Sequence, residues 1–274
     1  MALAARGTVR TTLSPDGVIG MDLKQIERNR EYDPFARLYN RHWGADYRVE
    51  VAPIVDRLLL SRVAVGAAVL DVCCGTGQFT EQIRQRGFEI AGVDASEEMI
   101  RYARVNAPGV KFTVADVREF SLGRTFDAAY CVYESLNHVP DTEGLGMAFR
   151  CIRRHLKTGA PFLFDLNREE AYILYWNNTD AIVEPDSAFI TRSVYDEDTK
   201  IGRCDITTFD LIVPDTNAAW RREDFTVRQT CHTMGAAQRA LFEAGFKDVT
   251  LHDARDAGMP GDAGYARTFF LAVA

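Results

Sequence analysis

The chain has 274 residues, of which 47% are hydrophobic and 26% charged, and its formal net charge is −7. This composition is typical of a globular protein, large enough for one domain with an insertion or for two small domains. An acidic surface repels phosphate backbones, so the charge balance disfavours a nucleic-acid partner. Because the sequence shows neither a secretory leader pattern nor an apolar run long enough to span a membrane, we expect a cytoplasmic protein with no membrane contact.

The cysteines form no C-x-x-C pair and have no histidine at metal-ligand spacing, so we expect no metal site and no disulfide framework. They are Cys73, Cys74, Cys131, Cys151, Cys204 and Cys231.

The first 60 residues predict a lead followed by a helical cap. Residues 1–20 mix Gly, Thr, Ser and Pro without periodicity. From Asp22 to Leu60 the apolar residues recur at helical spacing. They include Phe35, Leu38, Tyr39 and Trp43, then Val51, Ile54, Val55, Leu58 and Leu59.

From residue 61 to residue 168 apolar strands alternate with helical segments. This alternation predicts an α/β core with a Rossmann-like, doubly wound, mostly parallel sheet. The expected strands end near Val72, Asp94, Val117, Val132 and Asp165. The expected helices lie near Gln78–Arg86, Glu97–Asn106 and Thr142–Leu156.

After the fifth strand the pattern changes to short segments that alternate apolar and polar residues. Residues 169–232 therefore predict an antiparallel β-rich insertion, with strands at Ala181–Val183, Phe189–Asp196, Ile201–Val213 and Ala219–Thr230. Residues 233–274 predict a last helix, Met234–Gly245, and two closing strands of the core. An insertion at this point lies at the carboxyl edge of the sheet, where it can cover a ligand as a lid.

The turn after the first strand predicts a nucleoside site. Asp71 ends an apolar strand, and Gly75 and Gly77 allow the backbone to approach a ligand closely. A second acidic strand end, Asp94, follows 23 residues after Asp71, a spacing typical of a carboxylate that binds ribose hydroxyls. A dinucleotide site usually has a third glycine, but Thr80 stands there, which disfavours a nicotinamide dehydrogenase.

The segment Leu70–Gly77 resembles the first motif of class I S-adenosylmethionine-dependent methyltransferases, although Cys73 stands where the family usually has glycine. Segments that resemble the family's later motifs follow in the same order over roughly 100 residues. The resemblance implies S-adenosylmethionine as the cofactor. Its implied binding residues are Asp71, Gly75, Gly77, Asp94, Ala95, Asp116 and Val117.

The resemblance also implies particular roles. Asp94 would bind the ribose, Asp116 would accept from the adenine amino group, and the backbone amide of Val117 would contact adenine. Ser96 would cap the next helix. Two alternatives stay open: Asp71 caps the turn, and Met99, which could flank adenine, only packs in the core.

In the cap, the segment Phe35–Tyr39 resembles the family stretch that closes over the sulfonium. Tyr39 is a candidate catalytic residue and Trp43 a candidate substrate-binding residue, because aromatic faces favour a sulfonium cation. Tyr47 is a weaker candidate. The alternative is that these rings form the inner stripe of a cap helix.

The loop after the fourth strand supplies the candidate base. His138 stands where related small-molecule enzymes handle the acceptor, and a neutral imidazole can take a proton near neutral pH. Glu134 is a candidate binding residue for a cationic acceptor. The alternatives are a structural histidine and a solvated acid. Of the other histidines, only His232 in the insertion is kept in reserve.

Arginines on the expected lid strands are candidates for binding an anionic acceptor if they point inward. Arg192 is the first of them, with Arg203 and Arg221 beside it. Solvent-facing positions on the strands are the alternative.

The sequence therefore predicts transfer of a methyl group from S-adenosylmethionine to an N, O or C atom of a small molecule under a closing lid. The layout is similar to sugar-amine and glycine N-methyltransferases. The alternatives are a non-catalytic module that binds the cofactor and a nucleic-acid methyltransferase; the loop Tyr133–His138 lacks the Asp/Asn-Pro-Pro-Tyr/Phe motif of amino-directed DNA enzymes. An edge strand of the lid leaves a homo-oligomer open.

Overall fold

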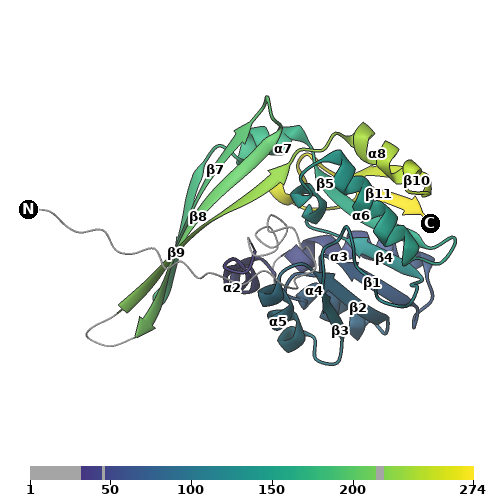
Figure 1. Ribbon diagram of the computed structural model, residues 1–274, viewed down its shortest axis with the longest axis horizontal. Helices are drawn as coiled ribbons and strands as arrows, with labels where there is room; N and C mark the ends of the chain where they lie inside the picture. Colours follow the sequence, from purple (N-terminus) through teal and green to yellow (C-terminus); the bar gives the residue numbers. More distant parts are fainter. Residues whose placement is uncertain (1–31, 45–46, 214–218) are drawn as a thin grey trace, which may run out of the picture.

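The computed structural model describes residues 32–44, 47–213 and 219–274. It contains a seven-stranded sheet and a separate four-stranded antiparallel sheet, joined in one chain (Figure 1). The strand order of the larger sheet is β10-β11-β5-β4-β1-β2-β3. Its strands are β1 (Ala68–Val72), β2 (Glu89–Asp94), β3 (Lys111–Val114), β4 (Ala128–Cys131), β5 (Pro161–Asn167), β10 (Lys247–Asp253) and β11 (Arg267–Val273).

The larger sheet is parallel from β3 to β5, and the pairs β5–β11 and β11–β10 are antiparallel. The strand order reverses on either side of β1, which pairs with β2 on one edge and with β4 on the other. This reversal is the point at which doubly wound folds bind ligands, beyond the carboxyl ends of the strands. The expected mostly parallel, doubly wound sheet is confirmed.

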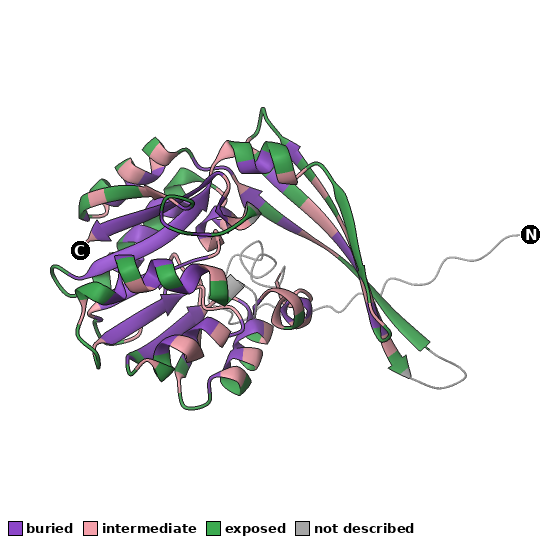
Figure 2. Ribbon diagram, turned by 180° about the vertical axis from the view of Figure 1, so that it is seen from behind, coloured by how far each residue is buried: buried purple, intermediate pink, exposed green. Residues whose placement is uncertain are grey.

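Two layers of helices cover this sheet, and its central strands β1, β4, β5 and β11 are almost entirely buried (Figure 2). Apolar side chains of α3 (Tyr47–Leu58) and α4 (Gln78–Gln85) pack on one face, and those of α6 (Thr142–Arg154) and α8 (Met234–Glu243) pack on the other. α5 (Glu97–Asn106) packs its buried Ile100 and Ala103 against Phe112 of β3. Within the described part of the chain, no helix has both the length and the apolar character that a membrane span needs.

The core helices begin where the sequence provides capping side chains. Ser96 Oγ accepts from the Met99 N–H at 3.1 Å, which confirms the expected cap of α5. Asp141 Oδ1 accepts from the Gly144 N–H at 2.7 Å at the start of α6, and Thr233 caps α8. At the end of α8, Gly245 has a left-handed φ of 91°, as a helix-terminating glycine should.

The insertion after β5 forms a long arm that reaches away from the core and passes over the cap (Figure 1). It begins with α7 (Glu169–Tyr175), which the sequence analysis did not predict. The arm's strands pair in the order β6-β7-β8-β9. They are β6 (Thr179–Val183), β7 (Ser187–Asp196), β8 (Ile201–Val213) and β9 (Ala219–Thr230). The expected antiparallel insertion is confirmed.

The cap is less regular than the helical pattern suggested. It consists of the short α2 (Ala36–Leu38), a π-helical turn η1 (Tyr39–Trp43) and α3, which begins at Tyr47. Three 3-10 turns elsewhere are η2 (Leu60–Arg62), η3 (Ser135–His138) and η4 (Asp262–Gly264). The expected helix over residues 22–31 lies outside the described residues, as does the side chain of Tyr47.

Gly77 joins the glycine turn to α4, and its backbone leaves no room for a side chain. Its φ is 73°, and an added Cβ would lie 2.8 Å from Ala103 Cβ of α5. We expect Gly77→Ala to lower the free energy of unfolding by about 2–4 kcal/mol, measured by urea denaturation. The control is Gly109→Ala, whose left-handed φ of 89° faces open space and carries only the backbone cost of about 1 kcal/mol. Equal losses in the two variants would contradict the close helix contact.

Candidate functional site

A cavity of about 710 Å³ lies between the carboxyl edge of the larger sheet, the cap and the arm. The core contributes Gly75, Asp94, Ala95, Met99, Asp116 and Val117 to its wall. The cap contributes Tyr32, Phe35, Tyr39 and Trp43, and the loop after β4 contributes Glu134 and His138. The cavity thus brings together most of the site residues that the sequence predicted.

The Asp94 carboxyl closes the core side of this cavity. Its Oδ2 accepts from the Gly75 N–H at 2.9 Å, and its Oδ1 accepts from the Ser96 N–H at 2.9 Å. Burial raises the pKa of Asp94, and these backbone hydrogen bonds oppose the rise. Gly75 has a left-handed φ of 52°, and an added Cβ would come within 3.4 Å of the Tyr39 ring. The turn is therefore held in place by the same carboxyl that faces the cavity.

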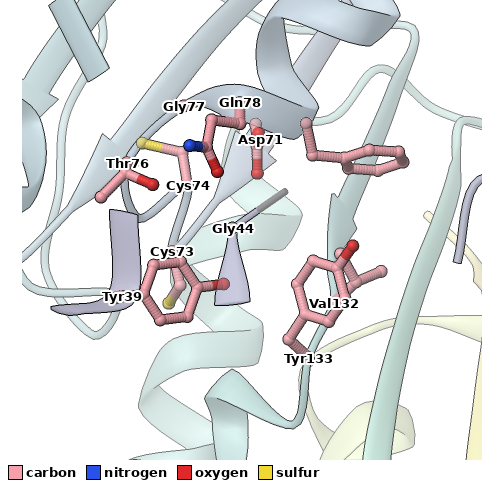
Figure 3. Close-up of a pocket in the computed structure, with 11 residues that line it drawn as sticks. Tyr39, Gly44, Asp71, Cys73, Cys74, Thr76, Gly77, Gln78, Val132 and Tyr133 are labelled. Carbon is pink, nitrogen blue, oxygen red and sulfur yellow. The ribbon is translucent and has the colours of Figure 1, made fainter. Parts of the chain in front are cut away.

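Asp71 and Gly77 are not among the residues that line this cavity, and their contact with the cofactor stays a prediction. They line a separate space of about 20 Å³ beneath the turn (Figure 3). Asp71 is 3% exposed, and its Oδ2 accepts from Thr80 Oγ1 at 2.6 Å and from the Tyr130 hydroxyl at 2.7 Å. The Asp71 carboxyl therefore ties the first strand to α4 and β4, and Gly77 serves the close packing of α5.

The remaining predicted cofactor residues line the large cavity. Ala95, Met99 and Val117 form part of its apolar wall. Met99 is also buried in the core, and its contact with adenine stays a prediction. Asp116 is bound by Arg118, whose Nε and Nη2 donate to its two oxygens at 2.8 and 2.6 Å. The contact of the Asp116 carboxylate with adenine stays a prediction.

The His138 ring, which also lines the cavity, has polar partners at both nitrogens. Its Nδ1 lies 2.8 Å from the Arg228 carbonyl oxygen, and the Tyr32 hydroxyl oxygen lies 2.6 Å from Nε2 and 3.0 Å from Nδ1. Burial lowers the pKa of His138 to about 4, opposed by the bond to the Arg228 carbonyl. Burial also raises the pKa of Tyr32, with the charge of Glu134 adding to the rise. The imidazole is therefore neutral and the phenol protonated near neutral pH.

Glu134 belongs to a buried ion-pair cluster. Arg267 of β11 pairs with Glu134, and its Nη1 donates to Asp165 Oδ2 of β5 at 2.9 Å. The Asp165 carboxyl also accepts from the Glu134 N–H at 3.0 Å. Tyr133 and Glu134 both have left-handed φ, 65° and 44°. Such backbone strain in a non-glycine pair is held by the surrounding contacts and fixes the direction of the Glu134 side chain.

The cap aromatics pack together and against the arm. The Phe35 and Trp43 ring centroids lie 5.2 Å apart, and the Trp43 ring is 5.4 Å from Phe189 of β7. Tyr39 lines both cavities beneath the cap. The aromatic stripe and the cavity wall are therefore the same surface.

The lid arginines do not line the cavity, which corrects the prediction for Arg192. Arg192 is exposed, and its Nη2 donates to Thr207 Oγ1 at 3.1 Å. Its strand neighbours Thr191 and Ser193 line the cavity instead, since alternate residues of a strand face opposite sides. The exposed Arg203 and Arg221 pair with acids of the arm. His232 is buried, with its Nε2 2.9 Å from the Val139 carbonyl oxygen, in a structural position.

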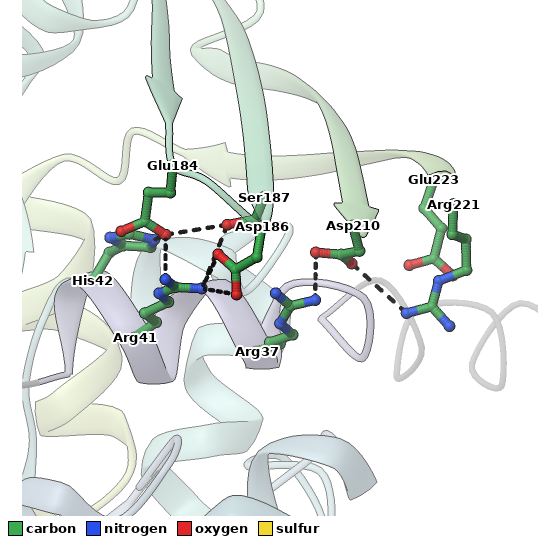
Figure 4. A network of polar contacts seen from close by, with 9 residues as sticks. All are labelled: Arg37, Arg41, His42, Glu184, Asp186, Ser187, Asp210, Arg221 and Glu223. Atoms are coloured by element: carbon green, nitrogen blue, oxygen red, sulfur yellow. Dashed lines mark hydrogen bonds and ion pairs between the residues drawn. The ribbon is translucent and has the colours of Figure 1, made fainter. Parts of the chain in front are cut away.

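Ion pairs join the cap to the arm outside the cavity (Figure 4). Arg37 of the cap pairs with Asp210 of β8. Arg41 lies 2.9 Å from Glu184 and 3.0 Å from Asp186, at the turn between β6 and β7. These partly exposed pairs are individually weak, but they connect the two elements that close over the cavity.

Several residues of the site escaped the sequence analysis. Tyr32 was not predicted as a site residue, although it stands in the Arg-x-Tyr-Asp-Pro segment Arg30–Pro34, a stretch of the cap that resembles small-molecule methyltransferases. Asp165 and Arg267 are 102 residues apart in the chain and meet only because β11 pairs with β5. No local pattern could have indicated that contact.

Comparisons with known proteins agree with this geometry. Residues 69–159 match the family described as Methyltransferase domain. Over 116 residues the chain is 36% identical to dTDP-3-amino-3,4,6-trideoxy-alpha-D-glucopyranose N,N-dimethyltransferase of Streptomyces venezuelae, covering 42% of this chain and 48% of that protein. Over 153 residues it is 34% identical to Ubiquinone biosynthesis O-methyltransferase of Xanthomonas oryzae pv. oryzae, covering 52% and 62%. The chain thus aligns with less than two thirds of the length of these relatives.

Solved structures resemble nearly the whole chain. The crystal structure of Streptomyces venezuelae DesVI has a TM-score of 0.69 and 26% identity over 86% of this chain and 95% of that one. The sugar N-methyltransferase KedS8 from Streptoalloteichus sp. has a TM-score of 0.71 and 22% identity, over 98% and 99%.

Residues 69–159 therefore match a methyltransferase domain, and the chain has the Rossmann-like fold of solved S-adenosylmethionine-dependent methyltransferases. S-adenosylmethionine is the cofactor that such a domain uses. The predicted fold, methyltransferase domain and cofactor are confirmed for these residues. The cavity fits that cofactor: Asp94 offers a carboxyl beside the glycine turn, Ala95 and Met99 give an apolar wall, and Tyr39 gives an aromatic face.

The burial of Asp71 makes a prediction about pH. Burial raises the pKa of Asp71 to about 7, opposed by hydrogen bonds from Thr80 and Tyr130. The folded state holds this proton more tightly than the unfolded state. The free energy of unfolding therefore falls as the pH rises from the ordinary pKa of an aspartate towards about 7. Asp71→Asn keeps an acceptor oxygen and cannot ionise. We therefore expect the free energy of unfolding of the variant, relative to that of the parent, to increase by about 2 kcal/mol as the pH rises from about 5 to about 8, measured by urea unfolding.

The matched control for this measurement is Asp180→Asn, which makes the same change at an exposed position of β6. Its stability difference from the parent should not vary with pH. If the free energies of unfolding of Asp71→Asn and the parent also differ by a constant amount from about pH 5 to about pH 8, the Asp71 carboxyl does not titrate as its burial implies.

Proposed function

We propose that this chain transfers the methyl group of S-adenosylmethionine to the amino group of a small molecule held under the arm. One observation supports this most strongly. A single cavity is lined both by the Asp94 turn and by Tyr32, Glu134 and His138. A cofactor and an acceptor can therefore share one space, as a direct group transfer requires.

Bound at the Asp94 end, S-adenosylmethionine supplies an electrophilic methyl group on a sulfonium. Gly75, Asp94 and Ala95 would hold its nucleoside, and Tyr39 and Trp43 would shield its cationic centre. In-line displacement needs alignment of the reacting atoms and exclusion of water. The cap and the arm provide both in this proposal, with the cap–arm ion pairs holding the closed arrangement.

The acceptor end suits an amine. The Glu134 carboxylate attracts an ammonium group, and its pairing with Arg267 fixes its place. An amine must lose a proton before it attacks carbon, and the neutral His138 ring, bonded to the Tyr32 hydroxyl, can accept one. The named sugar N,N-dimethyltransferase among the relatives also supports an amino acceptor. A hydroxyl acceptor is the second candidate, supported by the similarity to an O-methyltransferase.

The proposal includes the predicted division of the chain. Residues 1–60 would form the lead and cap, 61–168 the cofactor-binding core, 169–232 the lid, and 233–274 the closing part of the core. The same proposal gives the protein a small-molecule acceptor and no nucleic-acid or membrane partner. It also includes a cytoplasmic location and a possible homo-oligomer.

Binding of S-adenosylhomocysteine tests the cofactor site. We expect calorimetric titration to show binding by the parent that Asp94→Ala weakens about 10- to 100-fold, because a buried carboxyl that holds ligand hydroxyls contributes about 1.5–3 kcal/mol. Asp180→Asn, an exposed acid of β6, is the control and should bind as the parent does. No binding by the parent would contradict the proposed function.

Catalysis is tested by product. With a panel of amino, hydroxy and carboxylic acceptors, only an enzyme forms S-adenosylhomocysteine in an acceptor-dependent way. We expect turnover with amines and its loss in Glu134→Gln. Binding without turnover by any member of the panel would favour the non-catalytic module.

A further inference from the structure

A chain of hydrogen bonds runs from α7 through a lid strand to the candidate base. The Tyr172 hydroxyl donates to Gln229 Oε1 at 2.9 Å. Gln229 Nε2 lies 3.0 Å from His138 Nε2. Tyr172 is fully buried and Gln229 is 6% exposed, so water does not compete for these contacts. Gln229 belongs to β9, and neither residue carries a sequence motif of its own.

These contacts determine which nitrogen of His138 carries the proton. An amide nitrogen can only donate, so His138 Nε2 must accept from Gln229. A backbone carbonyl can only accept, so His138 Nδ1, 2.8 Å from the Arg228 oxygen, must carry the proton. Two separate partners thus require the same neutral tautomer. The Tyr32 hydroxyl oxygen lies 2.6 Å from Nε2 and 3.0 Å from Nδ1, so this contact does not distinguish the two nitrogens.

The same geometry opposes the charged form of the ring. A proton on Nε2 would point at the amide N–H of Gln229, and two facing donors repel each other. The other titratable groups around the ring are the Tyr32 phenol, which can donate to it or accept from it, and Glu134 of its own loop, which is paired with Arg267. The Tyr32 hydroxyl oxygen can also accept from Nε2, so a proton that His138 receives there has a partner, whereas the amide N–H of Gln229 opposes it.

We propose that Gln229, held by Tyr172, is a positioning residue that keeps His138 in the neutral tautomer with its lone pair on Nε2. The strand that closes the acceptor end thereby also sets the state of the group that receives the acceptor's proton. The role of His138 as base rests on the proposed function, whereas its tautomer and titration are properties of the chain alone.

Isotope-edited NMR of the histidine rings in the full-length protein tests this directly. His138→Gln assigns the His138 signals by their loss. We expect the parent ring to carry its proton on Nδ1 and to stay neutral across the neutral range. In Gln229→Glu a carboxylate oxygen replaces the amide donor, so the titration midpoint of His138 should rise by about 1–3 pH units. Gln238→Glu, the same change on α8 away from the cavity, should leave it unmoved.

Two further variants keep the proposal testable if Gln229→Glu does not fold. Gln229→Leu removes the opposing donor without adding an acceptor, so its midpoint should rise less than that of Gln229→Glu. Tyr172→Phe releases the amide oxygen and should weaken the preference for one tautomer. A parent ring protonated on Nε2 overturns the proposal without any variant. An unchanged midpoint in a folded Gln229→Glu protein overturns it as well.

The two proposals fail in different ways. If the parent does not bind S-adenosylhomocysteine, the proposed function fails while the tautomer result stands. If binding and turnover hold, the acid limb of the kcat/KM profile should move to higher pH in Gln229→Glu, with the cofactor KM unchanged. A uniform loss of rate at every pH would indicate a merely structural Gln229.

Discussion

The carboxyl of Asp94 binds two backbone N–H groups, of Gly75 and of Ser96, and the cofactor end of the cavity depends on this contact. One side chain thereby joins the glycine turn after β1 to the start of α5. Since Ser96 also caps α5 and donates to Asp33 Oδ1 at 2.6 Å, the same few atoms connect the core to the cap. The cavity floor is rigid because its polar groups are already paired with each other.

The acceptor end is built in another way. Its groups come from the cap, the loop after β4, the arm and the last strand, and they meet only in the folded protein. Buried ion pairs and hydrogen bonds have little net effect on stability, but they fix direction and protonation state. Here they orient Glu134 through Arg267 and engage both nitrogens of His138. The rigid core and the lid therefore contribute to the site in different ways.

Much of the fold could be predicted because its signals are local. Buried strands read as short apolar runs, Ser96 and Gly245 mark helix ends, and the arm's strands show period-two alternation. The short α7 was missed because seven residues with mixed propensities give little periodicity. The cap was predicted as helix, but its η1 turn is π-helical, a distinction that depends on packing rather than on spacing.

By itself, the sequence determined the class of domain, the cofactor and several of the residues around the cavity, because these follow from strand ends and turns close together in the chain. Only the tertiary structure decided which side chains face that cavity. It turned Arg192 outward and placed Asp71 beneath the turn, and it brought Arg267, Gln229 and Tyr32 to Glu134 and His138. The physical reason is that strand facing and long-range contact depend on pairing register and burial, which no local pattern specifies.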